Sequence, residues 1–364
     1  MPGVYVSYPF CNQKCTFCNF ASGVASGPRR SVYENALLRE IRNHRWEWLP
    51  ETLYFGGGTP SLLSISVLNE LLAAIPSAKM VEVTLECAPG TLSADRIAAW
   101  VKAGVNRVSL GVQSFDDSEL RHSGRRHTAE VVERDLELLR SSGISNISLD
   151  LIAGLPHQTS ESWAASLRWI ERLSPSHVSV YLFEVDEDSR LGKEILTGGT
   201  RYSAGFIPSE DDGARFYETA VDRLADLGYR RYEISNFSQP GFESHHNLKY
   251  WNLQPYVGFG LDAHSYDGTF RWGNPDNLEA YLRHVELPDG GAIREKVDPV
   301  EERFFVGMRL TDGIRPTAAE WSRFASPIDK WTRLGMLEHD NGALRLSPKG
   351  VLISNEVFQE FLNV

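Results

Sequence analysis

Two kinds of hydrophobic pattern alternate along the first two thirds of the chain. Short apolar runs rich in β-branched residues are typical of buried parallel strands, whereas apolar residues that recur every three or four positions are typical of amphipathic helices. The strand pattern occurs in six segments: Val4–Ser7, Thr52–Phe55, Val81–Glu86, Arg107–Val112, Ile147–Ile152 and Val178–Phe183. A further strand, Tyr232–Phe237, is expected to extend the sheet.

Helical stripes lie between and after these strands, and each is expected to face the core. The residues are Tyr33, Leu37 and Ile41; Leu68, Leu71, Leu72 and Ile75; Val132, Leu136 and Leu139; Trp163, Leu167 and Ile170; and Phe216, Ala220 and Leu224. Thr128 is a plausible N-cap for the third of these helices. Six β-then-α units predict an α/β fold with right-handed crossovers. Because a closed barrel needs eight units, we expect an open, partial TIM-like (β/α)6 barrel.

The C-terminal part has a different pattern, which predicts a second, small domain. A segment with a linker composition, Pro288-Asp289-Gly290-Gly291, divides the chain into a domain of residues 1–287, a linker of residues 288–300 and a domain of residues 301–364. Three helix-like runs and two strand-like runs follow: Glu302–Leu310, Ile314–Phe324, Pro327–Leu334, Met336–Glu338 and Ala343–Leu346. Because Asn341-Gly342 is a hairpin signal, the pattern predicts a winged-helix-like domain.

Composition and charge limit the possible partners. The 364 residues carry a net charge of -11, which disfavours a nucleic-acid partner and favours a packing role for the C-terminal domain. No stretch approaches the roughly 20 apolar residues of a membrane span. The first residues do not resemble a signal peptide, so we expect a cytoplasmic protein. Nothing in the composition indicates the oligomeric state.

Three of the four cysteines lie within eight residues, directly after the first predicted strand. Cys11, Cys15 and Cys18 have the spacing Cys-x3-Cys-x2-Cys. Thiolates are the usual ligands of iron–sulfur clusters, and a reducing compartment keeps them available. A structural zinc site would need a fourth ligand, and a redox pair of Cys15 and Cys18 would leave Cys11 unexplained. The fourth cysteine, Cys87, is expected to be a buried structural thiol.

Polar and glycine-rich segments follow the predicted strands at the edge where α/β barrels place their sites. The second strand leads into Gly56-Gly57-Gly58-Thr59-Pro60, the third ends at Glu86 and the fourth at Gln113. Asp150 lies within the fifth strand. A carboxylate inside an apolar strand is costly unless it is paired or faces a ligand, and Arg125 could supply the pairing charge.

The cysteine spacing, followed by six strand–helix units, resembles the radical SAM superfamily. In that family the three cysteines hold three irons of a [4Fe–4S] cluster, and the fourth iron binds S-adenosylmethionine, whose reductive cleavage gives a 5′-deoxyadenosyl radical. The resemblance implies that Cys11, Cys15 and Cys18 hold a cluster. It further implies that S-adenosylmethionine contacts Tyr5, Phe17, Gly57, Gly58, Thr59, Glu86, Gln113, Arg125 and Asp150.

Longer motifs resemble the oxygen-independent coproporphyrinogen III oxidase family over essentially the whole chain. They are YVSYPF before Cys11, GGGTPS, GVQSF, GRRHT and DLIAGLP. The oxidases of that family carry a long N-terminal extension and a fourth cysteine two residues after the third. Here ten residues precede Cys11, and position 20 is Phe20. Both departures disfavour oxidase activity.

The segment His246-Asn247-Leu248-Lys249-Tyr250-Trp251 resembles the distinguishing motif of the HemW group of this family. The resemblance implies haem binding and transfer to haem-dependent targets such as respiratory membrane enzymes, with His246 as a candidate iron ligand and His245 and His264 as competitors. From the residues alone, the favoured explanation is a loop whose His and Asn satisfy backbone groups and whose aromatic side chains pack.

Other functions of the same scaffold stay open at this point. One alternative is a radical SAM enzyme, either a methyltransferase or cyclopropanase or a coproporphyrinogen III decarboxylating oxidase, so the sequence does not decide whether the protein is an enzyme. The other is a structural zinc protein with a winged-helix interaction domain.

Overall fold

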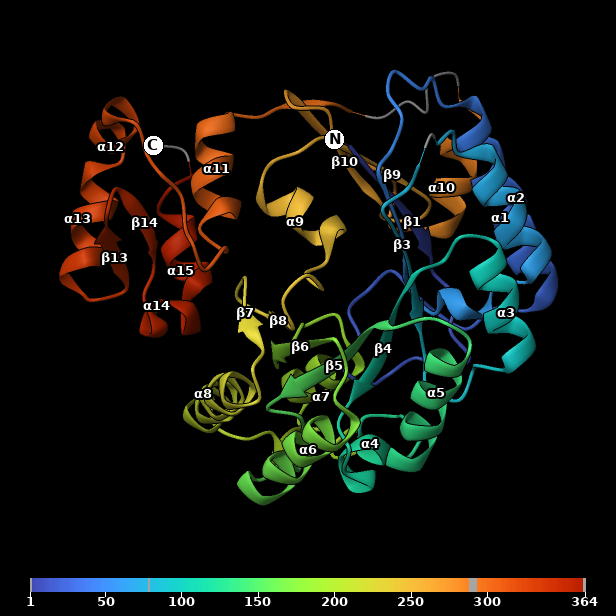
Figure 1. Cartoon of the computed structure of the whole chain (residues 1–364), viewed down its shortest axis with the longest axis horizontal. Helices are drawn as coiled ribbons and strands as arrows, with labels where there is room; N and C mark the ends of the chain where they lie inside the picture. Colours follow the sequence, from blue (N-terminus) through green and yellow to red (C-terminus); the bar gives the residue numbers. More distant parts are fainter. Residues whose placement is uncertain (1, 78, 288–292, 363–364) are drawn as a thin grey trace.

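The computed structural model describes residues 2–77, 79–287 and 293–362. Among these, twelve strands form one mixed sheet, and six neighbouring parallel strands make up its centre. The six are β1 (Gly3–Tyr8), β2 (Thr52–Gly57), β3 (Glu82–Cys87), β4 (Arg107–Gln113), β5 (Asn146–Ala153) and β6 (His177–Leu182). Figure 1 shows the sheet curving around a central space, with helices on its outer side. The two outermost strands do not pair with each other, so the predicted open α/β barrel is confirmed.

Helices follow the central strands and cover their outer side. They are α1 (Gly27–Asn43), η1 (Pro60–Leu62), α2 (Ile65–Ala74), α3 (Ala94–Lys102), α4 (Asp117–His122), α5 (Ala129–Ser141), α6 (Ser160–Leu173), α7 (Arg190–Thr197), η2 (Ala204–Phe206) and α8 (Glu210–Asp226). The predicted apolar stripes are buried, apart from a half-buried Leu72. Thr128 is the N-cap residue of α5, but its hydroxyl donates to the Glu130 carboxylate and does not accept from a helix amide.

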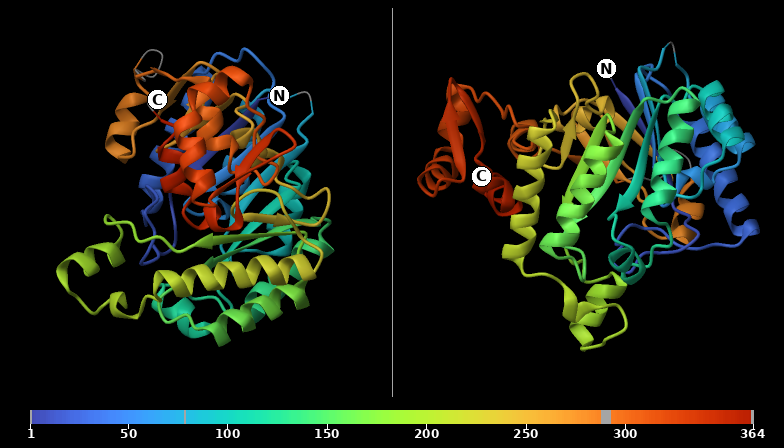
Figure 2. Two further views of the ribbon diagram at one scale, coloured as in Figure 1. Left: turned by 90° about the vertical axis from the view of Figure 1, so that its left-hand side faces the viewer. Right: turned by 60° about the horizontal axis from the view of Figure 1, so that its bottom comes forward.

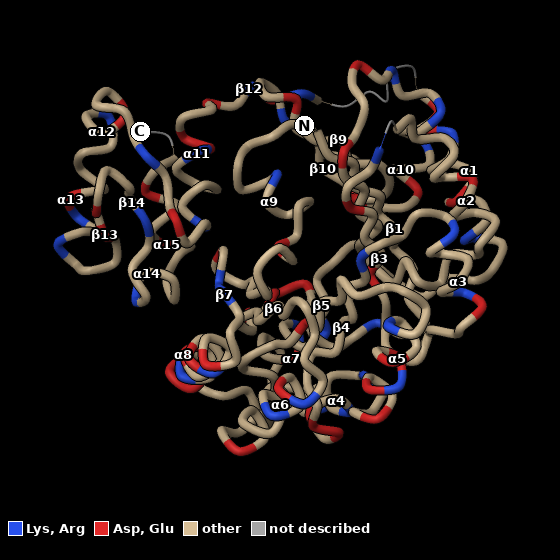
Figure 3. The backbone as a smooth tube through the Cα atoms, in the orientation of Figure 1, with Lys and Arg blue, Asp and Glu red and all other residues tan. Residues whose placement is uncertain are grey.

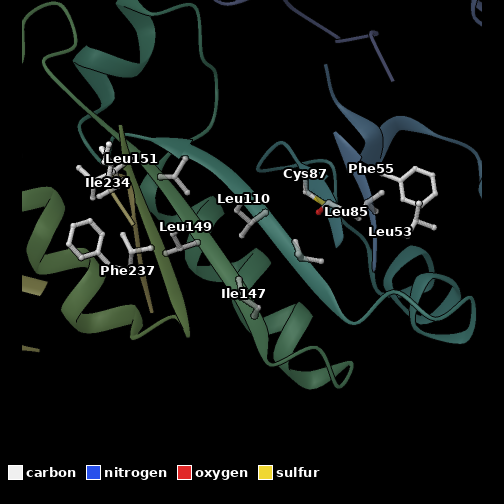
Figure 4. Packing of buried hydrophobic residues seen from close by; sticks show 14 of the residues in the cluster. Leu53, Phe55, Leu85, Cys87, Leu110, Ile147, Leu149, Leu151, Ile234 and Phe237 are labelled. Atoms are coloured by element: carbon white, nitrogen blue, oxygen red, sulfur yellow. The ribbon is translucent and has the colours of Figure 1, made fainter. Parts of the chain in front are cut away.

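The two faces of the central strands carry different residues. Side chains alternate between the faces of a strand, and the apolar set points outward to the helices, as Figure 4 shows for Leu53, Phe55, Leu110 and Leu149. The inward set is polar: Ser7, Thr52, Glu82, Thr84, Glu86, Arg107, Ser109, Ser148, Asp150, His177 and Ser179. The strands are therefore apolar on only one face, although their sequences suggested nearly continuous apolar runs. The polar face lines the inside of the curved sheet, where most of these side chains are buried.

Short strands extend the sheet at both edges. Beyond β1 lie β9 (Tyr256–Phe259), β10 (His264–Tyr266), β11 (Phe270–Gly273) and β12 (Glu295–Lys296), none of which has a long enough apolar run to be predicted. Beyond β6, the single strand predicted over Tyr232–Phe237 is wrong in detail. Two strands stand there, β7 (Arg230–Arg231) and β8 (Asn236–Ser238), and β8 pairs antiparallel with β6.

The C-terminal residues form a separate group of helices and a hairpin on one flank of the sheet (Figures 1 and 2). The elements are α11 (Pro299–Gly307), α12 (Ala318–Arg323), α13 (Ala325–Arg333), β13 (Leu337–Asp340), β14 (Ala343–Leu346), α14 (Pro348–Leu352) and α15 (Ser354–Gln359). The predicted hairpin is confirmed: Asn341 and Gly342 both have positive φ angles, 50° and 79°, as its two-residue turn requires. The helix predicted from Ile314 begins only at Ala318, because Ile314 pairs with Leu344.

The predicted linker coincides only in part with the structure. Residues 288–292 lie outside the described residues. Glu295 and Lys296 pair with β11 as strand β12, and α11 already begins at Pro299. The domain boundary at residues 288–300 therefore stays a prediction.

Candidate cofactor site

The three cysteines lie on a loop that leaves the carboxyl end of β1. The loop is closed by two backbone hydrogen bonds, from Cys11 N to Gly23 O at 2.9 Å and from Gly23 N to Pro9 O at 2.9 Å. Its middle is held by Thr16, whose amide donates to Ser123 O at 3.2 Å and whose carbonyl accepts from Leu191 N at 3.0 Å. The loop is thus anchored to the end of α4 and to α7.

The chemistry of this loop fits an iron–sulfur cluster. Cys11, Cys15 and Cys18 are free and partly exposed. Burial raises the pKa of the Cys15 thiol, while the neighbouring Arg125 opposes this rise and would offset thiolate charge. Within the described ranges, no three His, Cys, Asp or Glu side chains converge as ligands of a single metal ion. A four-iron cluster does not need such convergence, since each thiolate binds a different iron, whereas a zinc site does.

The glycine loop after β2 packs directly on the cysteine loop. Gly57 has a φ of 103°, a conformation that side chains disfavour. At Gly58 an added Cβ would lie 2.7 Å from Pro9 C, and the Gly58 amide donates to Tyr8 O at 2.8 Å. Thr59 follows and is buried. The predicted residues Gly57, Gly58 and Thr59 therefore line the same edge of the sheet as the cysteines.

Two predicted carboxylates lie on the inner face of the sheet, on β3 and β5. Glu86 accepts a hydrogen bond from Tyr54 Oη at 2.9 Å, and burial raises the pKa of Glu86 to about 7. Asp150 accepts from Ser109 Oγ at 2.8 Å and from Ser148 Oγ at 2.9 Å, and burial raises its pKa above the usual value. Glu86 can therefore hold or release a proton near neutral pH, while Asp150 is an acceptor fixed by hydroxyls.

Gln113 and Arg125 lie together over Gly111 at the end of β4. A Cβ at Gly111 would be 3.1 Å from Gln113 Nε2 and 3.6 Å from Arg125 Nη2. The Nε of Arg125 is buried without a hydrogen-bond partner in the described part of the chain. A guanidinium with one N–H unsatisfied next to the cysteine loop fits a ligand carboxylate. The remaining predicted contact, Phe17, packs edge-to-face on Phe183 with 6.0 Å between the ring centres.

A pocket of about 280 Å³ opens beside the cysteine loop, between β1 and the turn after β9. It is lined by Tyr5, Ser7, Phe20, Ala21, Ser22, Gly57, Tyr250, Tyr256, Leu261, Asp262 and His264. The imidazole of His264 is 62% exposed, and its Nε2 lies 3.9 Å from Asp262 Oδ1. The sequence indicated Tyr5, Gly57 and His264. It gave no signal for Tyr256, Leu261 and Asp262, because they lie in and after a four-residue strand.

His246 does not line this pocket, and its role as a ligand of haem iron stays a prediction. It is on α9 (His245–Trp251), is 1% exposed, and is hydrogen-bonded through Nδ1 to Thr52 Oγ1 at 2.9 Å and through Nε2 to Tyr250 Oη at 2.8 Å. With both ring nitrogens occupied, it has no free lone pair for a metal. Its competitor His245 is exposed, on the same helix.

Comparison with known proteins relates this arrangement to a family. Residues 5–170 match the radical SAM superfamily, and residues 295–353 match the HemN C-terminal domain. The chain is 35% identical to the heme chaperone HemW of Lactococcus lactis, over 98% of this chain and 96% of that protein. It is 33% identical to the heme chaperone HemW of Bacillus subtilis, over 100% and 99%.

The fold also resembles a solved structure. Coproporphyrinogen III oxidase (HemN) from Escherichia coli has a TM-score of 0.84 at 21% sequence identity, and the match covers 100% of this chain and 90% of that one. This likeness shows the fold alone. Within the described residues, no helix is long and apolar enough to cross a membrane.

Proposed function

Because the chain belongs to the HemW family of radical SAM proteins, we propose that it is a haem chaperone, which binds haem and passes it to haem-accepting proteins such as respiratory membrane enzymes. The observation that carries the proposal is full-length similarity to heme chaperones, combined with an aromatic pocket beside the cysteine loop. The family implies a [4Fe–4S] cluster and S-adenosylmethionine. A reducing cytoplasm suits the three free thiols.

The residues at the edge of the sheet divide into groups by the part of the cofactor each suits. Cys11, Cys15 and Cys18 would hold the cluster, which supplies an open iron for S-adenosylmethionine when it is bound. The unsatisfied Arg125 suits a carboxylate, and the acceptors Glu86 and Asp150 suit amino and hydroxyl groups. Tyr5, Gly57 and Thr59 would form the walls near the cluster.

For haem we propose His264 as the iron ligand in place of His246. Its imidazole lines the pocket and is exposed to an incoming ligand, and the Asp262 carboxylate can orient the ring. The rings of Phe20, Tyr250 and Tyr256 line the same space and suit a flat macrocycle.

Haem titration of the full chain with its reconstituted cluster tests both statements. The wild type and His245→Ala should develop the same Soret band, because His245 lies outside the pocket lining. His264→Ala should lose or shift the band. A wild type that develops no Soret band would refute the proposal of a haem chaperone. An unchanged spectrum in His264→Ala would refute the proposal that His264 is the iron ligand.

The alternative of a decarboxylating oxidase has only the shared fold in its favour. It is tested by anaerobic incubation with dithionite, S-adenosylmethionine and coproporphyrinogen III. Formation of a decarboxylated porphyrinogen would replace the chaperone proposal by an enzymatic one.

A further inference from the structure

The segment HNLKYW forms most of α9, and this helix closes the end of the barrel away from the cysteine loop. The Gly3 amide at the start of β1 donates to Pro255 O, just after the helix, at 3.1 Å. A Cβ at Gly3 would lie 3.1 Å from Lys249 Cδ and 3.2 Å from His246 Cε1. The helix therefore packs so closely on β1 that no ligand fits between them. Figure 1 shows α9 beside the space that the sheet surrounds.

A buried carboxylate holds the first turn of this helix. Glu82, the first residue of β3, is 1% exposed and accepts hydrogen bonds from the amides of His245 at 2.9 Å and His246 at 3.0 Å. It also accepts from Ser244 Oγ at 3.3 Å. Free amides and the positive end of the helix dipole both favour an anion here. Burial lowers the pKa of the neighbouring Arg107, but Glu82, Tyr54, Tyr232 and Asp150 together raise it by more than burial lowers it. Arg107 therefore stays charged and balances the Glu82 carboxylate.

The imidazole of His246 links the anchored start of the helix to the side chain of Tyr250. It stacks on Tyr54 with 5.2 Å between ring centres and is bonded at one nitrogen to Thr52 and at the other to the Tyr250 hydroxyl. The ring is neutral at physiological pH because burial, together with the charges of Lys249 and Arg107, lowers the pKa of His246 to about 3. A neutral ring fixed at both nitrogens is suited to orient a neighbour.

Tyr250 is the residue of the segment that reaches the pocket. Its ring lines the pocket opposite Tyr5, and its edge-to-face contact with Tyr256 has a centre distance of 4.6 Å. We propose that Tyr250 is the ligand-contacting residue of HNLKYW, and that His246 and Glu82 are positioning residues that hold it at the pocket wall. The ligand class is a flat ring system with polar edges. Two ligands of the proposed function belong to this class: haem and the adenosyl group of S-adenosylmethionine. The inference rests on the proposed function only for which of these ligands is bound.

Matched variants of the full-length, cluster-reconstituted protein test the role of Tyr250. Dissociation constants are measured for haem, from the Soret band, and for S-adenosylmethionine, by equilibrium dialysis. Tyr250→Phe should weaken at least one of them by about 3- to 10-fold, the usual effect of one lost hydrogen bond, and should lower Tm because the bond between the hydroxyl and His246 Nε2 is lost as well. The control is Tyr266→Phe, a buried tyrosine outside the pocket lining, which should change neither.

The role of His246 is tested by rescue. His246→Ala should weaken the same ligand and lower Tm, whereas His246→Gln can bond to both Thr52 and Tyr250 and should restore the affinity to within about twofold. Glu82→Ala should likewise weaken the ligand and lower Tm, and Glu82→Gln should restore most of the affinity. The wild-type Soret spectrum should persist in His246→Gln if His246 only positions Tyr250. An amide does not replace an imidazole as an iron ligand, so the spectrum would change if His246 were the ligand.

Two results would overturn the inference. One is a His246→Gln variant that keeps the wild-type Tm but loses the Soret band as His246→Ala does. The other is a Tyr250→Phe variant with both affinities unchanged. A wild type that binds S-adenosylmethionine but no haem would refute only the proposed function, since the remaining ligand still reports on Tyr250. Binding of neither ligand would refute both.

Discussion

The two ends of the barrel are both built from polar residues, yet they differ in whether those residues have partners. At the cysteine end three thiols are free, Arg125 Nε has no hydrogen-bond partner in the described chain, and a pocket opens. At the α9 end Glu82 accepts from two amides and a hydroxyl, and His246 is bonded at both nitrogens. An unmade hydrogen bond at a buried polar residue is therefore one sign of a ligand, whereas burial of a polar residue by itself is not.

Arg107 lies between these two ends and is an exception, because it is buried with two nitrogens that have no hydrogen-bond partner within the described chain, yet it does not line the pocket. It is 2% exposed near the start of β4, and its Nε and Nη1 have no hydrogen-bond partner among the described residues, although Glu82 and Asp150 lie near enough to influence its pKa. Its charge is thus compensated from both sides. Figure 3 shows that most other Lys, Arg, Asp and Glu residues lie on the outer helices and loops, with both signs interspersed.

The largest effect is expected at the cysteine end. Replacing Cys11, Cys15 or Cys18 by Ala should abolish the cluster, because the three thiols on this loop are its proposed ligands. The loss would be seen in the visible absorbance and in the iron and sulfide content. The apo-protein should keep its Tm, since these thiols are partly exposed and pack little.

Cys87→Ala is the control with the opposite outcome. Its thiol is 3% exposed on β3 and belongs to the outward, apolar face. The change should cost on the order of 1 kcal/mol of stability through a small cavity and leave the cluster intact. Loss of the cluster in this variant, or its retention in Cys11→Ala, would contradict the assignment.

How far the sequence alone predicts this contrast depends on the range of the interactions. The six central strands and their helices follow from local periodicity, and the cysteine loop from spacing within eight residues. The function of His246 depends on Thr52, 194 positions away, and on Glu82, 164 positions from it, which no local pattern reveals. The family motif that contains His246 suggested that this residue binds iron. The alternative, a histidine that is hydrogen-bonded to other parts of the protein, describes its surroundings better.

The second effect concerns pH and the α9 end. The pKa of His246 is about 3 in the folded protein and near 6.5 when unfolded, so the unfolded state binds the extra proton between these values. Stability should therefore fall as the pH drops below about 6.5, and this residue should contribute about 2 kcal/mol of that loss by pH 5. His246→Gln should remove this part of the loss, so the urea-unfolding free energies of wild type and variant should converge on acidification.

The same measurement has an internal comparison. His127, whose pKa is lowered to about 4 by burial and by Arg125, remains in both proteins and adds equally to the two pH profiles. Glu82, Lys249 and Arg107 also face His246 and are unchanged in the variant. Parallel profiles between pH 7 and pH 5 would mean that His246 is not held neutral in the folded state.

The smallest effect tests whether α9 also holds the C-terminal domain. Trp251 ends the helix, and the Arg309 guanidinium lies over its ring at 4.5 Å from the centre while Nη2 reaches the buried Glu233 carboxylate at 3.4 Å. A cation–π pair that is partly shielded from water should give a coupling of about 1 kcal/mol. A double-mutant cycle of Trp251→Leu and Arg309→Met, followed by urea unfolding, measures this coupling directly. Lys330 over Trp331, at 4.8 Å within the C-terminal domain, is the matched pair that does not bridge to the barrel. A coupling of zero at Trp251 would mean that this pair does not help to hold the C-terminal domain on the barrel. The backbone bonds from Ile234 N to Arg309 O and from Thr311 N to Tyr232 O, both at 3.1 Å, and the Arg309–Glu233 ion pair would then hold it.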